Sequence, residues 1–191
     1  MELYNIDARD IDHVLINEEE IAECVEAIAR QIDKDVEALG GELLLVCVLK
    51  GSLIFTSDLA RKIKTPLKID FIKASSYGSG TVSGGNLKIS LDVGSHDWDK
   101  KFVVIVEDII DSGNTLSKLI KYFKDKGATR VKTCTLLDKP ERREVDLAPD
   151  YCGRSIPNEF VVGYGLDVAE CYRELPFVGV LKPEVIKKYI G

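Results

Sequence analysis

Residues 102–115 read FVVIVEDIIDSGNT, and the interpretation of the whole fold starts from this stretch. Its first five residues are β-branched or aromatic, which is typical of a strand buried on both faces. Acidic, hydroxyl and glycine residues follow, and residues 116–126 then have the apolar spacing of an amphipathic helix. The stretch therefore predicts a buried strand, a polar turn and a helix, in that order.

The same alternation continues on both sides. Apolar runs predict further strands at 43–49, 67–74, 86–92, 131–137, 160–162 and 178–181. Helical spacing predicts helices at 18–39, 53–63 and after Pro183. Asn17 and Glu20 have the spacing of a capping box at the start of the first of these helices. We therefore predict an α/β fold, with a mostly parallel twisted sheet flanked by helices, in one domain spanning residues 1–191.

The composition limits the class of protein. With 191 residues, 45% of them apolar, the chain can form one sizeable core. Its net charge of -6 disfavours a nucleic-acid partner. The five cysteines form no C-x-x-C pair, which indicates a reducing compartment. Because the chain has no signal peptide and no apolar stretch of the roughly 20 residues that span a bilayer, we expect a cytoplasmic protein without a membrane partner.

The segment after the 102–106 strand carries the clearest chemical signal, since sheets of this kind bind ligands at the carboxyl ends of their strands. Residues 111–115 offer backbone N–H groups and hydroxyls at a helix start, which suits a phosphate. Glu107 and Asp108 only accept hydrogen bonds, so they suit hydroxyl donors or a metal ion. Ribose 5-phosphate offers both a diol and a phosphate. The alternative is that the turn only caps a helix and that both acids are solvated.

Two more segments suit an anionic ligand. Lys50 lies between a strand and a helix start, where a cation is unfavourable unless an anion is near. Gly51 would let the backbone approach that anion. The simpler interpretation of Lys50 alone is an exposed side chain. The Gly/Ser-rich segment 75–85 is either a plain connection or a lid in which Ser76 and Tyr77 order over a ligand.

Five motifs in this order resemble the phosphoribosyltransferases that use phosphoribosyl pyrophosphate (PRPP), and most closely the bacterial hypoxanthine-guanine (6-oxopurine) branch. They are LKGS at 49–52, SSYG at 75–78, EDIIDSGNT at 107–115, LLDKP at 136–140 and EFVVGYGLDVAECYRELP at 159–176. The resemblance implies the type I phosphoribosyltransferase fold. It also implies a small hood lobe from N-terminal and C-terminal segments, the latter roughly 150–191, and a lid at 75–85.

The resemblance implies ligands for each part of PRPP. These are Glu107 and Asp108 for the ribose diol and a first Mg²⁺; Asp111, Ser112, Gly113, Asn114 and Thr115 for the 5-phosphate; Lys50, Gly51 and Arg173 for pyrophosphate; and Asp167 for a second Mg²⁺. In this family the bond matching Leu49-Lys50 is often cis. Ser52 departs from the pattern, because many relatives have a second glycine there.

The resemblance also implies how the purine is held. Lys139 would donate to the 6-oxo group, Phe160 would stack on the base, and the Val161 backbone would contact its other edge. Asp111 would exchange a proton at N7. Without the motifs, Lys139 and Arg173 are ordinary surface charges and Phe160 is a core aromatic.

The implied reaction is displacement at ribose C1, giving IMP from hypoxanthine or GMP from guanine and releasing pyrophosphate. The resemblance implies a homo-oligomer, either a dimer or a tetramer. Two alternatives stay open. One is a phosphoribosyltransferase for orotate, uracil or adenine. The other is a nucleic-acid-binding regulator of the same fold that senses PRPP, which the net charge of -6 disfavours.

Overall fold

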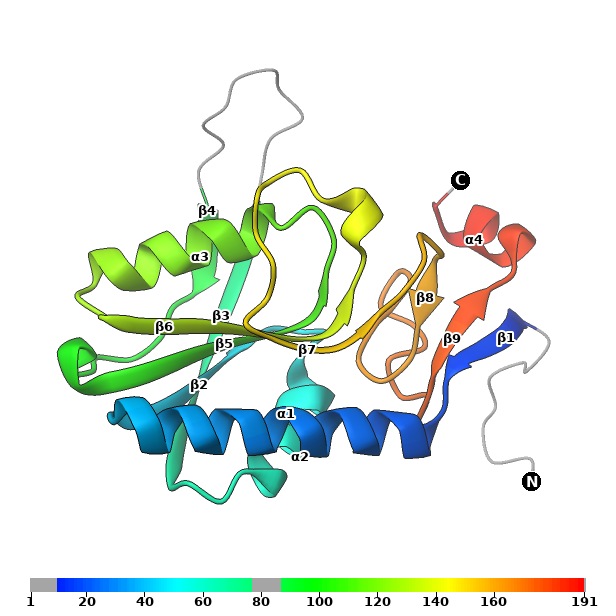
Figure 1. Ribbon diagram of the computed structural model, residues 1–191. Helices are drawn as coiled ribbons and strands as arrows, with labels where there is room; N and C mark the ends of the chain where they lie inside the picture. The colour runs from blue at the N-terminus through cyan, green and yellow to red at the C-terminus, as the bar shows by residue number, and fades with distance from the viewer. Residues whose placement is uncertain (1–9, 77–86, 191) are drawn as a thin grey trace.

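The computed structural model describes residues 10–76 and 87–190. Their largest element is a six-stranded sheet in the order β4-β3-β2-β5-β6-β7 (Figure 1). All neighbouring strands are parallel except the β3–β4 pair, which is antiparallel at one edge. The strands are β2 (Glu42–Val48), β3 (Leu67–Ser76), β4 (Leu87–Leu91), β5 (Lys101–Ile110), β6 (Arg130–Asp138) and β7 (Tyr151–Ser155). The predicted α/β fold with a mostly parallel sheet is confirmed.

Helices cover both faces of this sheet (Figure 1). The helices α1 (Glu18–Leu39) and α2 (Leu53–Lys62) lie on one face, and α3 (Asn114–Asp125) lies on the other. In β5, Phe102 and Val104 pack in the core beneath α1 and α2, whereas Val103 and Ile105 pack in the core that includes α3. This division explains the uninterrupted apolar run, because a strand covered on both faces needs apolar side chains at successive positions.

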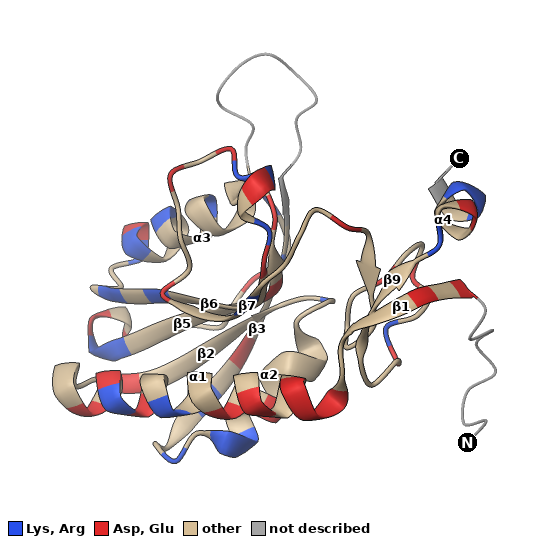
Figure 2. Cartoon of the chain, turned by 45° about the vertical axis from the view of Figure 1, so that its right-hand side comes forward, with Lys and Arg blue, Asp and Glu red and all other residues tan. Residues whose placement is uncertain are grey.

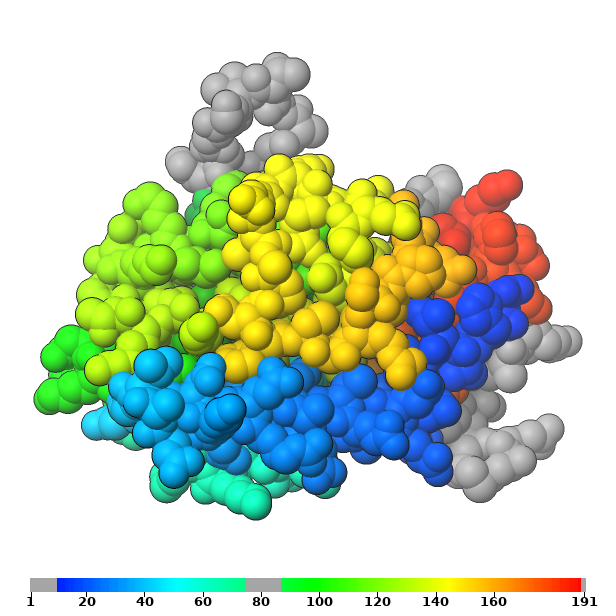
Figure 3. Space-filling view, in the orientation of Figure 1, coloured from blue at the N-terminus to red at the C-terminus, as the bar shows by residue number. Residues whose placement is uncertain are grey.

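The first helix begins as its sequence predicts. The Asn17 side chain accepts a hydrogen bond from the Glu20 N–H, and the Glu20 carboxylate accepts one from the Asn17 N–H, which completes the capping box. On the face that Figure 3 shows, α1 (blue) lies beside the segment containing β7 (yellow to orange). Arg154 in β7 donates to Glu20 across 2.9 Å, and the Tyr151 hydroxyl donates to Asp35 across 2.7 Å. These contacts fix α1 against the edge of the sheet.

A smaller sheet in the order β1-β9-β8 stands at one end of the large one, on the right in Figure 1. It contains β1 (Ile11–Ile16), β8 (Val161–Val162) and β9 (Val178–Leu181), and α4 (Pro183–Ile190) follows it. We call these elements, with the loop 163–177, the hood. Its core includes Val162, Val168, Tyr172, Leu175 and Leu181. The first and last described strands, β1 and β9, thus pair in one layer beside the large sheet.

Three details differ from the sequence prediction. Strand β5 extends through the acidic pair to Ile110, because its pairing with β6 continues to Ile110 opposite Asp138. Strands β1 and β7 were not predicted. Strand β1 is mostly exposed with irregular pairing, and β7 contains a glycine and an arginine, so neither shows a clear apolar pattern. Two short 3-10 helices, η2 (Trp98–Lys100) and η3 (Pro140–Arg142), join the remaining elements.

Charge on the exterior is mixed in sign. Acidic residues predominate along α1, whereas the charged residues of α3 are mostly lysines (Figure 2). Among the described residues, no helix combines the length and apolar character needed to cross a membrane.

Candidate active site

The turn at 111–115 joins β5 to α3. Gly113 is the N-cap residue and has a left-handed φ of 81°, and no side chain caps the helix. A Cβ atom on Gly113 would lie 2.8 Å from a Val145 methyl group, so the position also requires glycine for space. Neither Asp111 nor Ser112 is therefore the N-cap residue, as the capping alternative would require. The Ser112 hydroxyl instead accepts from the Asn114 N–H at 3.3 Å, within the turn.

The two carboxylates near the end of β5 are partly buried. Burial, together with the neighbouring Asp108 charge, raises the pKa of Glu107 to about 8. Burial also raises the pKa of Asp108 to about 6, although a bond from the Ile109 N–H and the positive charge of Arg173 oppose the rise. Among the described residues, the Glu107 backbone pairs with β6, but its carboxylate has no hydrogen-bond or ion-pair partner. Both carboxylates therefore favour a ligand that supplies positive charge or hydroxyl donors.

The loop after β2 brings backbone close to these acids. The Leu49-Lys50 peptide bond is cis, as the resemblance implies. A Cβ atom on Gly51 would lie 1.8 Å from Asp108 Oδ2, so any larger residue would displace the carboxylate. Ser52 is buried, and its hydroxyl donates to the Val48 carbonyl at 2.7 Å. The serine that departs from the family pattern thus closes the loop with a bond that glycine could not make.

The hood loop approaches the same place from the other side. A Cβ atom on Gly165 would lie 1.9 Å from the Gly51 carbonyl oxygen, so the two glycines allow the loops to touch. Arg173 donates from Nη1 to the Gly165 carbonyl at 2.7 Å and pairs through Nη2 with Asp167 at 2.9 Å. The structure therefore brings together Lys50, Gly51, Asp108, Asp167 and Arg173.

Glu170 joins the two cations of this group. Its Oε2 atom lies 2.9 Å from Lys50 Nζ and 3.2 Å from Arg173 Nη2. The hydrogen bond from Lys50 and then the one from Arg173 lower the pKa of Glu170 below its usual value. The sequence patterns predict no role for this residue. The only sequence feature that could have indicated a role for Glu170 is its position in the same motif as Asp167 and Arg173.

The predicted purine residues come from two elements: Lys139 follows β6 beside the start of the 111–115 turn, and Phe160 and Val161 belong to the hood. The Lys139 N–H, just after β6, donates to the Ile110 carbonyl at 3.0 Å. Burial lowers the pKa of Lys139 below its usual value. The charge of Arg142 also lowers this pKa, whereas the charges of Asp111 and Glu159 partly oppose the change. Phe160 is partly buried and packs against the hood core, and Val161 pairs with Val180 in β8. No hydrogen bond or ion pair joins the Lys139 side chain to the hood within the described residues.

A segment that the sequence analysis did not single out holds the 111–115 turn in place. Arg142 Nε donates to Asp111 Oδ1 at 3.1 Å, and Arg143 Nε donates to the Asp111 carbonyl at 3.1 Å. The Glu144 N–H donates to the Ser112 carbonyl at 3.0 Å, and Asn114 Nδ2 donates to the Glu144 carboxylate at 2.6 Å. In the sequence these residues resemble any charged surface stretch.

The remaining predicted residues concern the lid and the metal. Ser76 is the last residue of β3, and Tyr77, like most of the 75–85 segment, lies outside the described residues. The described residues contain no group of three or more ligand side chains that could enclose a metal ion. Glu107 and Asp108 nevertheless fit Mg²⁺, because this ion commonly binds one or two carboxylates and completes its shell with water and substrate phosphate.

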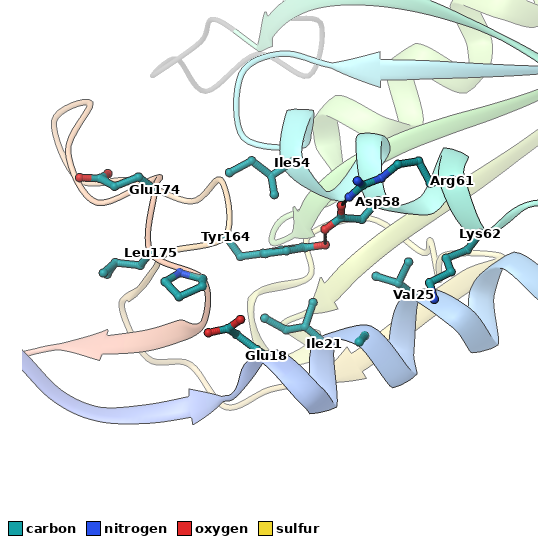
Figure 4. Close-up of a pocket in the computed structure, with 12 residues that line it drawn as sticks. Glu18, Ile21, Val25, Ile54, Asp58, Arg61, Lys62, Tyr164, Glu174 and Leu175 are labelled. Atoms are coloured by element: carbon teal, nitrogen blue, oxygen red, sulfur yellow. Dashed lines mark hydrogen bonds and ion pairs between the residues drawn. The ribbon is translucent and has the colours of Figure 1, made fainter. Parts of the chain in front are cut away.

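A cavity of about 650 Å³ lies away from this group, between α1, α2 and the hood (Figure 4). Ile21, Val25, Ile54 and Leu175 give it an apolar lining. Its Asp58 already accepts from the Tyr164 hydroxyl at 2.6 Å and pairs with Arg61. Because none of the residues that converge on Asp108 or Asp111 lines this cavity, the candidate active site is the strand-end group.

The chain is similar to known proteins of one family. Residues 12–169 match the model of the phosphoribosyl transferase domain. The chain is 46% identical over 180 residues to the hypoxanthine-guanine phosphoribosyltransferase of Streptococcus thermophilus, covering 94% of this chain and 98% of that protein. It is also 48% identical over 176 residues to the bifunctional protein TilS/HprT of Listeria monocytogenes, but it spans only 27% of the length of that relative.

Solved structures show the same likeness. A hypoxanthine phosphoribosyltransferase from Staphylococcus aureus superposes with a TM-score of 0.89 at 43% identity, covering 96% of this chain and 98% of that one. The hypoxanthine phosphoribosyl transferase of Trypanosoma cruzi has a TM-score of 0.89 at 39% identity, with 95% and 97% covered.

Proposed function

Because this chain belongs to the phosphoribosyltransferase family, we propose that it transfers the 5-phosphoribosyl group of PRPP to N9 of hypoxanthine or guanine. The products are IMP or GMP and pyrophosphate, which makes the reaction one of purine salvage. One observation supports this most strongly. The Lys50–Gly51 loop and Arg173 approach Asp108, and the 111–115 turn follows the two β5 carboxylates directly, so groups suited to pyrophosphate, ribose and 5-phosphate adjoin one another.

Each part of PRPP then has a ligand. The backbone N–H groups of 111–115 and the hydroxyls of Ser112 and Thr115 bind the 5-phosphate at the positive end of α3. Glu107 and Asp108 accept from the ribose diol. Lys50, Arg173 and the Gly51 backbone bind the pyrophosphate, whose charge grows as it leaves.

Magnesium is the proposed cofactor. Glu107 and Asp108 would hold one ion, and Asp167 would hold a second. When bound, Mg²⁺ supplies positive charge to the pyrophosphate oxygens. It would also favour the ionised form of Glu107 and Asp108, whose pKa values burial raises.

The purine binds between the end of β6 and the hood. Lys139 donates to the 6-oxo group, and the Val161 backbone contacts the 2-position edge. Stacking on Phe160 contributes roughly 1–3 kcal/mol. Asp111 takes or returns the proton at N7 while N9 forms the bond to C1. A lid that includes Ser76 and Tyr77 excludes water from the cation-like sugar.

The test is magnesium-dependent release of pyrophosphate from PRPP, with hypoxanthine, guanine, xanthine, adenine, uracil and orotate offered separately. We expect turnover with hypoxanthine, guanine or both. Turnover with adenine or a pyrimidine alone would contradict the roles of Lys139 and Asp111. Binding of PRPP without turnover of any base, together with a gel shift of RNA or DNA at low salt, would favour the PRPP-sensing regulator instead.

We also propose that the enzyme is a cytoplasmic homo-oligomer, either a dimer or a tetramer. Exposed apolar side chains on α2, β3 and β4 support association, among them Leu53, Ile69, Phe71 and Leu91. A published structure of the Trypanosoma cruzi relative concerns the role of its C-terminal region in oligomeric state and enzymatic activity. Size-exclusion chromatography with light scattering tests the proposal, and a monomer at micromolar concentration would contradict it.

A further inference from the structure

A single carboxylate oxygen occupies the space between the two cations assigned to pyrophosphate. Glu170 Oε2 bridges Lys50 Nζ at 2.9 Å and Arg173 Nη2 at 3.2 Å. A bridging phosphate oxygen would need the same two donors at similar distances. The contact therefore resembles the bound state of the anion, with a side chain of the protein in the place of the ligand.

The turn that carries Glu170 holds its backbone firmly. The Glu170 N–H donates to Asp167 Oδ2 at 2.8 Å, and Val168 and Cys171 exchange backbone hydrogen bonds at 3.2 and 3.0 Å. Ala169 and Glu170 have left-handed φ values of 49° and 69°, which residues other than glycine seldom adopt. The backbone of this turn thus presents the Glu170 side chain toward Lys50 from a fixed position.

The side-chain contacts themselves are easily exchanged. The side chains of Glu170 and Lys50 are 64% and 49% exposed, and ion pairs this exposed are weak. Arg173 has other anchors, the Gly165 carbonyl and Asp167, and its buried Nε has no hydrogen-bond partner among residues 10–76 and 87–190. Arg173 therefore stays in position when Glu170 leaves, and it keeps donor capacity for an arriving anion.

We propose that Glu170 is a positioning residue of the pyrophosphate site, whose carboxylate takes the place of a phosphate oxygen while the site is empty and is displaced when pyrophosphate or PRPP binds. This inference rests on the proposed function, which assigns Lys50 and Arg173 to pyrophosphate. Its consequence is a competition. Glu170 keeps the two cations near each other in the empty site, weakens binding of the anion, and speeds its release.

The experiment measures binding of magnesium pyrophosphate to the whole protein by isothermal titration calorimetry. Glu170→Gln keeps the length of the side chain and removes its charge. We expect its Kd for pyrophosphate to fall roughly two- to tenfold at low salt, as expected when two exposed ion pairs no longer compete. The difference should shrink in 0.5 M NaCl, because salt screens exposed charges. In steady state the KM for PRPP should fall without a rise in kcat.

Two further variants separate competition from other effects. Glu174→Gln removes the same charge from an exposed neighbour that makes no ion pair in the described part of the chain, so its Kd should stay within twofold of the parent. Glu170→Asp keeps the charge on a shorter side chain. Its Kd for pyrophosphate should therefore lie between those of the parent and of Glu170→Gln. A Kd that is unchanged or higher in a Glu170→Gln protein with native thermal stability would overturn the proposal.

Lys50→Ala and Arg173→Ala distinguish this inference from the proposed function. If neither change weakens pyrophosphate binding, the assignment of the pyrophosphate site is wrong. If both weaken it and Glu170→Gln does not strengthen it, the site assignment holds and only the role of Glu170 fails.

Discussion

Arg142 Nε donates to Asp111 Oδ1 across 3.1 Å, so a residue of η3 holds the side chain proposed to exchange the purine proton. Both side chains are about half exposed, at 55% and 46%, and the energy of such a pair is small. Its effect is on orientation, because a carboxylate that accepts from a fixed guanidinium has fewer rotamers than a free one. Arg143, which donates to the backbone of the same residue, keeps the turn itself in place.

We therefore expect Arg142→Gln to lower kcat with hypoxanthine by roughly two- to fivefold, the range that corresponds to loss of one exposed pair, while the KM for PRPP changes little. Arg142→Lys should recover part of the loss. Arg30→Gln is the matched control, since Arg30 forms an exposed pair with Glu26 at 3.0 Å on α1, on the outer face of the molecule. An unchanged kcat in Arg142→Gln would show that Asp111 is oriented without this contact.

Gly51 offers a steric test of the pyrophosphate loop. A methyl group there would lie within 1.8 Å of Asp108 Oδ2, so Gly51→Ala must move either the loop or the carboxylate. Displacements of about 1 Å at a reacting centre cost on the order of 100-fold in rate, and we expect kcat/KM for PRPP to fall by about that factor. Gly94→Ala is the control, because its added methyl would make only an ordinary contact at 3.5 Å. Full activity in Gly51→Ala would mean that this loop does not approach Asp108 in the working enzyme.

Asp33 provides a prediction about stability alone. Its carboxylate accepts from the Lys64 and Thr65 N–H groups and from the Thr65 hydroxyl. Burial raises the pKa of Asp33, but these bonds outweigh burial and lower it below the usual 3.8. A lowered pKa stabilises the folded state above pH 3.8, and this stability disappears as the pH falls through the folded pKa. Asp33→Asn should therefore cost about 1 kcal/mol at pH 7 and almost nothing near pH 2 in urea unfolding. An equal cost at both pH values would assign the effect to packing.

The sequence predicts the parts of this protein that depend on neighbours along the chain. Residues 102–115 are readable because strand, turn and helix follow one another, and each has its own local pattern. Asn17 and Glu20 are readable for the same reason. Strand β7 cannot be predicted in this way. Its Gly153 packs against Cys24 of α1, a residue far away in the sequence.

The residues of the candidate site also fall into a group that the local sequence predicts and a group that depends on distant contacts. Glu107, Asp108 and the turn after them stand out because acids, a hydroxyl and a glycine follow an apolar strand directly and precede a helix. The partners of these residues come from far along the chain. Arg142 lies 31 residues from Asp111, and Glu170 lies 120 residues from Lys50. Nothing in a charged surface stretch indicates which of its members will face a distant loop, so the contacts that orient Asp111, Lys50 and Arg173 required the structure.

The buried carboxylate of Glu107 should make the stability of the metal-free protein depend on pH. Burial raises the pKa of Glu107 to about 8 from its usual 4.5, so the folded protein keeps a proton that the unfolded chain releases. Stability should therefore fall as the pH rises from 4.5 to 8, by on the order of a few kcal/mol.

Glu107→Gln removes the part of this dependence that comes from Glu107. In urea unfolding without Mg²⁺, the variant should be more stable than the parent at pH 8 and about equal to it at pH 4.5. The same change should weaken binding of PRPP in the presence of Mg²⁺, because the neutral amide attracts neither the ion nor the ribose hydroxyls as strongly. A variant that gains stability at pH 8 and keeps parental affinity for PRPP would show that Glu107 is buried without contacting the ligand. A variant that loses stability at every pH would instead show that the carboxylate has a structural partner in the folded protein.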